Sequence, residues 1–177
     1  MKKILFLIMV IVAGFTMFSS CERDDICPEE TPTTPLMILR FYDASDTSLI
    51  KPVSGLRVVG LNDDDTELEP AFTPAASDSI ALPLRVFQNT TRFIFIKDYV
   101  AATDTAPEQG NRDTLTFNYM TQEVFLNRAC GFIANYNLDN TAGVVIIDDG
   151  DNWISDTLIE NDGLINNQNA AHVRIFH

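Results

Sequence analysis

Apolar and polar residues alternate along most of the chain after residue 35, and this pattern predicts β-strands. The clearest alternation lies in residues 114–119, where Leu115, Phe117 and Tyr119 share one side. A strand with one buried face has this period of two, because successive side chains point to opposite faces of a sheet. The same reasoning predicts further strands over residues 36–42, 56–61, 80–87, 92–96, 132–138, 144–147, 153–159 and 173–176.

Turn-forming clusters separate these runs, at residues 62–65, 88–91, 104–112 and 148–152. We expect the second of these turns to close a hairpin between the strands on either side of it. Pro83 should lie at a sheet edge or a bulge, because proline has no N–H group to donate to a neighbouring strand. Only residues 122–128 have a pattern that a short helix would fit.

Many short strands separated by turns favour an all-β fold. We predict an antiparallel β-sandwich, Ig-like or related, with eight or nine short strands. A parallel α/β fold would need helical patterns between the strands, and the sequence has none. We expect six aromatic residues within the strand runs to belong to the core: Phe41, Phe87, Phe93, Phe95, Phe117 and Phe132.

The first 21 residues are typical of a bacterial secretory signal peptide followed by a lipid attachment site. Lys2 and Lys3 precede an apolar run over residues 4–18, and two small residues stand directly before Cys21. This arrangement resembles the lipobox of bacterial lipoproteins, which implies cleavage before Cys21 and acylation of its thiol and new amino group. The alternative is an uncleaved N-terminal anchor, although about fifteen apolar residues are fewer than the roughly twenty that span a bilayer.

Residues 21–35 have the composition of a lipidated acidic and proline-rich tether, and residues 36–177 that of a single β-sandwich domain. Glu22, Asp24 and Asp25 resemble the surface-export signals of some Gram-negative lipoproteins, and the alternative is a plain solvated spacer. We therefore expect a lipid anchor in an outer membrane, on its periplasmic or its cell-surface face.

The chain is strongly acidic, with 12 Lys or Arg against 25 Asp or Glu. Cleavage after residue 20 would remove two lysines and no acid, and would make the formal net charge more negative, from −13 to −15. Contacts to phosphate need a basic patch, so we expect no nucleic-acid partner. The acidic balance suits solubility at a negatively charged cell surface.

Two cysteines remain if Cys21 carries lipid, namely Cys27 and Cys130. Beyond the inner membrane the compartment is oxidising, which favours a disulfide between them. Closing a loop of this length would stabilise the fold by up to ~4.7 kcal/mol in the chain-entropy account. A metal site is the alternative, but two cysteines without clustered histidines fall short of a zinc ligand set.

Several local segments resemble an uncharacterised family of bacterial lipoproteins, a domain of unknown function. The segments are residues 21–27, 35–43, 78–84, 128–132 and 172–176. The resemblance implies a small β-rich lipoprotein with two paired cysteines, and it implies no activity.

Candidate chemistry is sparse. Asp148, Asp149 and Asp151 form an acidic cluster that invites a calcium interpretation, but it lacks the glycine of an EF-hand loop and is better read as a surface turn. Residues 63–65 are interpreted in the same way. Neither a G-x-S-x-G nor an H-E-x-x-H motif is present in the sequence.

The remaining candidates for a site are two histidines and one tryptophan. We expect His172 to be a satisfied or exposed strand residue rather than a general base, and His177 lies beyond the last strand. Trp153 borders the acidic turn and could present its ring to a glycan; burial against residues 154–159 is the alternative. No metal or other cofactor is expected.

A repeated tripeptide, Asp-(Ser/Thr)-apolar, occurs four times and resembles the O-glycosylation acceptor of some Gram-negative bacteria. Its hydroxyl residues are Ser79, Thr105, Thr114 and Thr157, of which Thr105 falls in the most loop-like segment. The alternative is local, because Asp and Ser or Thr make side-chain turns just before strands.

Together these observations predict a non-enzymatic, lipid-anchored envelope protein, an accessory or interaction module with an envelope protein as partner. A surface module that binds a glycan or a peptide is the alternative. A hydrolase that uses a pair of carboxylates is the third hypothesis.

Overall fold

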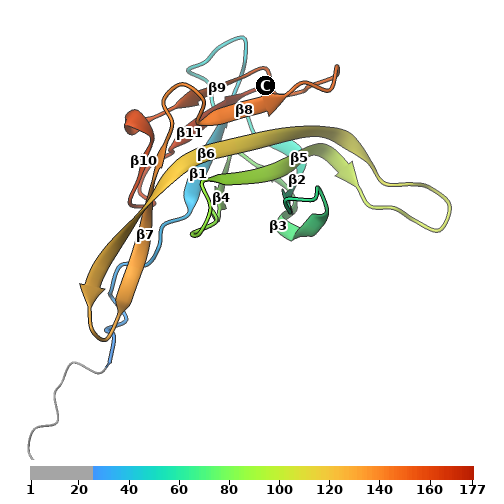
Figure 1. Ribbon diagram of the computed structural model, residues 1–177. Coiled ribbons are helices and arrows are strands. Elements are labelled where there is room, and N and C mark those ends of the chain that lie inside the picture. Colours follow the sequence, from blue (N-terminus) through green and yellow to red (C-terminus); the bar gives the residue numbers. More distant parts are fainter. Residues whose placement is uncertain (1–25) are drawn as a thin grey trace, which may run out of the picture. The chain divides into compact units, whose positions relative to one another are not determined.

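The computed structural model describes residues 26–177, and these residues form an all-β structure without an α-helix (Figure 1). Cys21 and the signal-peptide prediction lie outside the described residues. None of the described residues belongs to a helix long and apolar enough to cross a membrane. The strands are β1 (Met37–Tyr42), β2 (Val53–Leu61), β3 (Glu67–Ser77), β4 (Ser79–Leu82), β5 (Thr90–Val100), β6 (Gln109–Asn127), β7 (Gly131–Leu138), β8 (Val144–Ile147), β9 (Asp156–Ile159), β10 (Leu164–Ile165) and β11 (Val173–Phe176).

The chain divides into two compact units, which we describe separately. The tip unit comprises residues 26–32 and 125–132, that is, the turn between β6 and β7 with a short N-terminal segment. The sandwich unit comprises residues 33–124 and 133–177.

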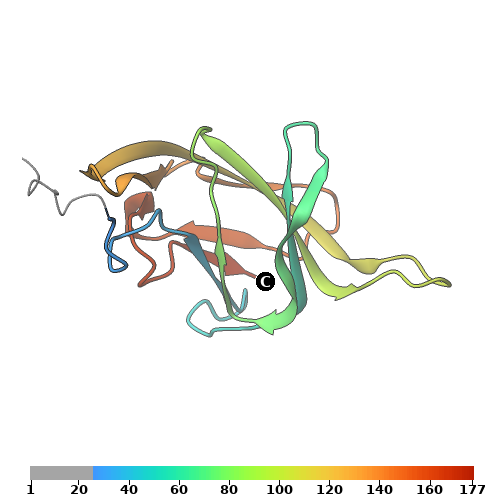
Figure 2. The same cartoon turned by 90° about the horizontal axis from the view of Figure 1, so that it is seen from below.

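Two sheets make up the fold. The four-stranded sheet has the order β4-β1-β11-β9, and Figure 2 shows the C-terminal strand beside the blue first strand. That β1–β11 pair is parallel and joins Leu39 to Val173, whereas the other pairs recorded in both sheets are antiparallel. The seven-stranded sheet has the order β10-β7-β6-β5-β2-β3, with β8 paired to β6.

The core of the sandwich unit lies between the two sheets. Alternate residues of β1 point inward, namely Met37, Leu39 and Phe41, and all three are fully buried. They pack in one cluster with residues of the larger sheet, including Phe95 of β5 and Phe117 of β6. Apolar faces of two sheets that pack on each other are the basis of a β-sandwich, so the predicted fold class is confirmed.

The predicted hairpin between residues 80–87 and 92–96 is wrong. β4 ends at Leu82 and pairs with β1, whereas β5 pairs with β2 and β6 in the other sheet. After Pro83 the chain is held as a loop, because Arg85 forms an ion pair with Asp63 at 2.5 Å and donates to a backbone carbonyl of β2. Phe87, predicted as a core residue, is 93% exposed in this loop.

Three other details differ from the sequence predictions. Residues 122–128 are not helical, since β6 continues to Asn127. β3 was not predicted, because its prolines and acidic residues are unusual in strands; it lies at a sheet edge and pairs irregularly with β2, where proline is tolerated. The two-residue β10 is too short to leave a pattern.

Candidate functional site between two free sheet edges

β8 and β9 are the outermost strands on one side of the sandwich unit, and each belongs to a different sheet. Among the strands of residues 26–177, β9 pairs only with β11, and β8 pairs only with β6. An edge strand presents unpaired backbone groups to anything that lies beside it. The sandwich unit therefore has two free edges close to one hollow, described below.

The alternation of hydrogen-bonded positions along β8 and β9 shows which of their backbone groups face away from their own sheets, toward the open side. Glu160 N–H donates to the carbonyl of His172 at 2.8 Å, and Asn118 N–H donates to the carbonyl of Gly143 at 2.9 Å. In an antiparallel pair the bonded positions alternate. It follows that Thr157 and Ile159 of β9, and the even-numbered residues of β8, direct their N–H and C=O groups away from their own sheets.

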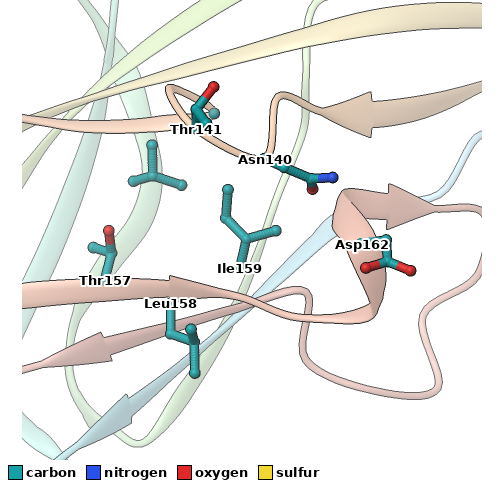
Figure 3. Close-up of a pocket in the computed structure, with 8 residues that line it drawn as sticks. Asn140, Thr141, Thr157, Leu158, Ile159 and Asp162 are labelled. Atoms are coloured by element: carbon teal, nitrogen blue, oxygen red, sulfur yellow. The ribbon is translucent and has the colours of Figure 1, made fainter.

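A hollow of about 440 Å³ lies beside these edges and is open to solvent. Thr157 and Ile159 extend from β9 toward the turn that carries Thr141, while Leu158 points to the opposite side (Figure 3). Asn140, Thr141 and Asp162 form a polar rim (Figure 3). The remaining lining comes from Gly143 and Val144, at the start of β8.

One side of this rim is a hydrogen-bonded turn over residues 139–143. A single carboxylate oxygen of Asp139 accepts hydrogen bonds from the N–H and hydroxyl of Thr141 and from the N–H of Ala142, at 2.7–2.9 Å. These hydrogen bonds lower the pKa of Asp139, and the bond from the Thr141 hydroxyl has the largest effect. A Cβ on Gly143 would lie 2.2 Å from the carbonyl oxygen of Asp139, so the turn closes this tightly only with glycine.

The other side of the rim is a left-handed turn over residues 161–163. Asn161, Asp162 and Gly163 have φ angles of 50°, 53° and 80°. L-residues adopt this region rarely, and Asn, Asp and Gly adopt it most readily. Backbone strain of this kind is concentrated at binding sites and switch regions, which makes the hollow the best candidate site of the sandwich unit.

Exposed apolar side chains border the two free edges. Val145 and Ile147 of β8 and Leu158 of β9 are each more than one third exposed. The backbone of the edge and these side chains together could bind an extended polypeptide, because strand addition uses main-chain hydrogen bonds and contacts to alternate side chains.

The predicted cysteine pair is a disulfide in the structure. Cys27 and Cys130 are bonded within the tip unit, with their Cα atoms 4.8 Å apart. The bond fixes the N-terminal segment to the turn that follows β6.

The acidic turns bind their own backbone. In the turn after β8, Asp148 and Asp149 accept from the N–H groups of Gly150 and Asp151 at 3.0 and 3.2 Å. Within residues 26–177, no group of three or more potential metal ligands comes together. In the turn after β2, Asp63 pairs with Arg85, as described, and Asp65 with Arg92.

Asp113 is a buried carboxylate that sequence reasoning missed as a structural residue. It has no exposed surface, and its two oxygens accept from the N–H groups of Trp153 and Ile154 at 3.2 and 2.7 Å. Burial raises the pKa of Asp113, and the two backbone hydrogen bonds oppose that effect. The alternation could have revealed it, since Asp113 has the same phase as Leu115 and Phe117.

Trp153 packs into the sandwich unit. Its indole N–H donates to the carbonyl of Phe95 at 3.2 Å, and its ring lies 5.6 Å from that of His177 and 6.5 Å from that of Phe41. These contacts occupy the indole, so the geometry does not favour Trp153 as a glycan platform.

Both histidines have structural partners. The His172 ring is buried and its Nδ1 accepts from Ile38 N–H at 2.9 Å, which requires a neutral ring. Nε2 of His177 lies 3.0 Å from the carbonyl oxygen of Lys51. Burial lowers the pKa of both histidines.

The four candidate glycosylation residues lie apart from one another and have different exposure. Thr105 is exposed in the β5–β6 loop, while the other three lie in strands and are partly buried. The Ser79 hydroxyl donates to the carbonyl of Leu39 at 3.1 Å, and Thr157 lines the hollow. Glycosylation at these positions stays a prediction.

Comparison with known proteins gives one match. A family described as "Family of unknown function (DUF6452)" matches residues 55–177. No curated protein and no solved structure matches the chain. The comparisons and the described residues give no evidence for an enzymatic activity.

Proposed function

This chain belongs to DUF6452, a family of unknown function, and we propose that it is a lipid-anchored accessory protein of the outer membrane. In this proposal Cys21 carries the lipid, and the open side between β8 and β9 binds an extended segment of an envelope protein. The observation that carries the binding proposal is the hollow beside two free sheet edges.

Chemistry at the free edges supports a polypeptide as the ligand. Thr157 and Ile159 direct backbone groups to the open side, and an added strand would satisfy them. The N–H of Thr157 is bonded to the carboxylate of Asp156 at 2.8 Å in the structure. A charged side chain that covers an edge in this way protects it from indiscriminate pairing, and an arriving strand would displace it.

A short motif rather than a long strand fits this site. β8 and β9 have four residues each, and strands rise about 3.3 Å per residue. Polar residues on the rim and apolar ones beside the edges would select a segment that alternates in the same way. The glycan alternative has less support, because the ring of Trp153 is occupied by packing.

The binding site is tested by photo-crosslinking in cells of the native host. A photoreactive phenylalanine analogue replaces Val145 on β8, Leu158 on β9 or, as the control, Leu164 on β10. Leu158 and Leu164 are matched, being 48% and 43% exposed leucines on edge strands. We expect positions 145 and 158 to form adducts with the same protein and position 164 to form none. Equal adducts from all three positions, or none, would contradict the site.

The anchor is tested separately by intact-mass analysis of protein isolated from native membranes. We expect the mass of a chain that begins at Cys21 and carries acyl groups. Replacement of Cys21 by alanine should remove the acyl mass, because the thiol and the new amino group of Cys21 are the proposed attachment points. An unmodified Cys21 would end the proposal of a lipoprotein.

A further inference from the structure

We infer that the tip unit rests in the surface of the lipid bilayer, with Ile26, Phe125 and Phe132 in contact with lipid. This inference rests on the proposed lipid anchor at Cys21 and goes beyond it by assigning a second, apolar contact between the protein and the membrane.

Exposed apolar residues are the first observation. Ile26 is 83%, Phe125 56% and Phe132 65% exposed. Phe132 was predicted as a core residue, and that prediction is wrong. Solvent-facing positions of strands usually carry polar residues, whereas grouped exposed aromatic residues mark a surface that something else covers.

These residues form one surface. The rings of Phe125 and Phe132 lie on adjacent strands with centroids 5.1 Å apart. Ile26 and Phe125 line the same shallow hollow, of about 480 Å³, together with Pro28 and residues 126–129. The apolar patch of the tip unit is therefore continuous, and aromatic side chains are well suited to the boundary between lipid and water.

The disulfide fixes this surface near the anchor. Cys27 is bonded to Cys130 at the turn after β6, and only six residue steps separate Cys27 from Cys21. A fully extended chain covers at most about 3.6 Å per residue, so Cys27 stays within roughly 22 Å of the lipidated residue. A folded surface held that close to a bilayer meets lipid before it meets other partners.

Charge explains why the contact is apolar. Among the described residues of the tip unit, Arg128 is the one basic residue, and the acidic residues are Glu29 and Glu30. A polybasic segment is needed for strong attraction to anionic lipid, and this unit lacks one. Burial of the phenylalanine rings is the remaining source of affinity, and it does not depend on salt.

Depth-dependent fluorescence quenching tests the inference on the full-length lipidated protein. Phe132→Trp in the tip unit is compared with Phe87→Trp, whose phenylalanine is 93% exposed in the sandwich unit. Both proteins retain Trp153 as a common background. They are reconstituted into phosphatidylcholine vesicles with and without brominated acyl chains.

We expect bromolipid to quench the added tryptophan at position 132 severalfold more strongly than that at position 87, with a blue-shifted emission only at 132. Equal quenching at the two positions would overturn the tip contact while leaving the anchor intact. A blue shift at 132 that persists without vesicles and disappears on dilution would instead indicate a second copy of the chain, and would also overturn it. Intact mass is measured on the same samples. Absence of lipid on Cys21 would overturn the anchor and the tip contact together.

Phe125→Ser/Phe132→Ser provides a second test that does not depend on tryptophan. Non-reducing mass analysis first verifies the disulfide, and an unchanged melting temperature verifies the fold. We expect this protein to be extracted from vesicles at a lower detergent concentration than the wild type, at low and at high salt. Extraction at the same detergent concentration as the wild type would contradict the inference.

Discussion

The sandwich unit and the tip unit use phenylalanine in opposite ways. In the sandwich unit Phe41, Phe95 and Phe117 are completely buried between two sheets. In the tip unit Phe125 and Phe132 are more than half exposed, and a disulfide rather than a core joins the segments. Burial therefore stabilises the first unit, whereas a covalent bond stabilises the second and leaves its apolar surface free for another role.

The largest expected effect separates these two uses of phenylalanine. Phe95→Ala should lower the free energy of unfolding by about 3–5 kcal/mol, because it leaves a cavity in the core. Phe132→Ala should change it by less than ~0.5 kcal/mol, because the ring is mostly in water. Urea denaturation of the lipid-free chain measures both, and similar losses for the two variants would contradict the division.

Removal of the disulfide should have the next largest effect. Cys27→Ser/Cys130→Ser should lower the free energy of unfolding by about 2–4 kcal/mol, since the unfolded chain gains the freedom of a loop of this length. In this variant, the amide hydrogens of residues 125–132 should exchange faster than in the wild type, and by a larger factor than those of the core strands. A protein that loses its disulfide without any loss of stability would indicate that the tip unit is not held by this bond.

A buried polar contact in the sandwich unit should matter less than the core. The two oxygens of the Asp113 carboxylate accept one N–H each, from Trp153 and from Ile154. Asp113→Asn keeps the shape of the side chain but has only one oxygen to accept these two N–H groups. One buried N–H then lacks a partner, at about 1–3 kcal/mol. Thermal unfolding measures the loss. Asp149→Asn in the exposed acidic turn is the control and should be neutral.

The smallest expected effect is a pH dependence from His172. Burial lowers its pKa in the folded protein below the ordinary value of 6.5. A lowered pKa means that the stabilisation is present above the unfolded-state pKa and is lost as the pH falls through the folded-state value. Stability should therefore decrease in mildly acidic buffer below about pH 6.5.

His172→Asn tests this dependence, because an amide oxygen can accept the N–H of Ile38 without titrating. The variant should lose part of the acid sensitivity, and His177, whose pKa burial also lowers, should account for the rest. An unchanged pH profile in the double variant with His177→Asn would show that other groups control it.

Period-two alternation was sufficient to predict the fold class and several strands, among them β11 with its observed bounds, Val173–Phe176. It failed where tertiary context decides. β4 and β5 are neighbours in sequence but pair in different sheets, and the ion pair of Arg85 that holds the loop between them is with Asp63, in the turn after β2. Phe132 has the same alternation as the buried Ala134 and Tyr136 of β7 but is itself 65% exposed. A sequence pattern does not tell which end of a strand is covered.

The candidate site was even less predictable. The cysteine count was enough to expect the disulfide, because compartment chemistry limits the choices. The free edges of β8 and β9 depend on strand order, which no local pattern encodes. Thr157 was singled out for its hydroxyl, but its place in the hollow follows from the pairing of β9 with β11.

Amide hydrogen exchange of the protein, in membranes of the native host and after purification in detergent, tests the central claim, binding of a partner segment between β8 and β9, most directly. If a partner strand binds between β8 and β9, the N–H groups that face the open side, those of Val144, Ile146, Thr157 and Ile159, should exchange more slowly in native membranes. Residues 164–165 of β10, on another sheet edge, should be unchanged. Identical exchange of β8 and β9 in the two preparations would contradict the proposed binding site.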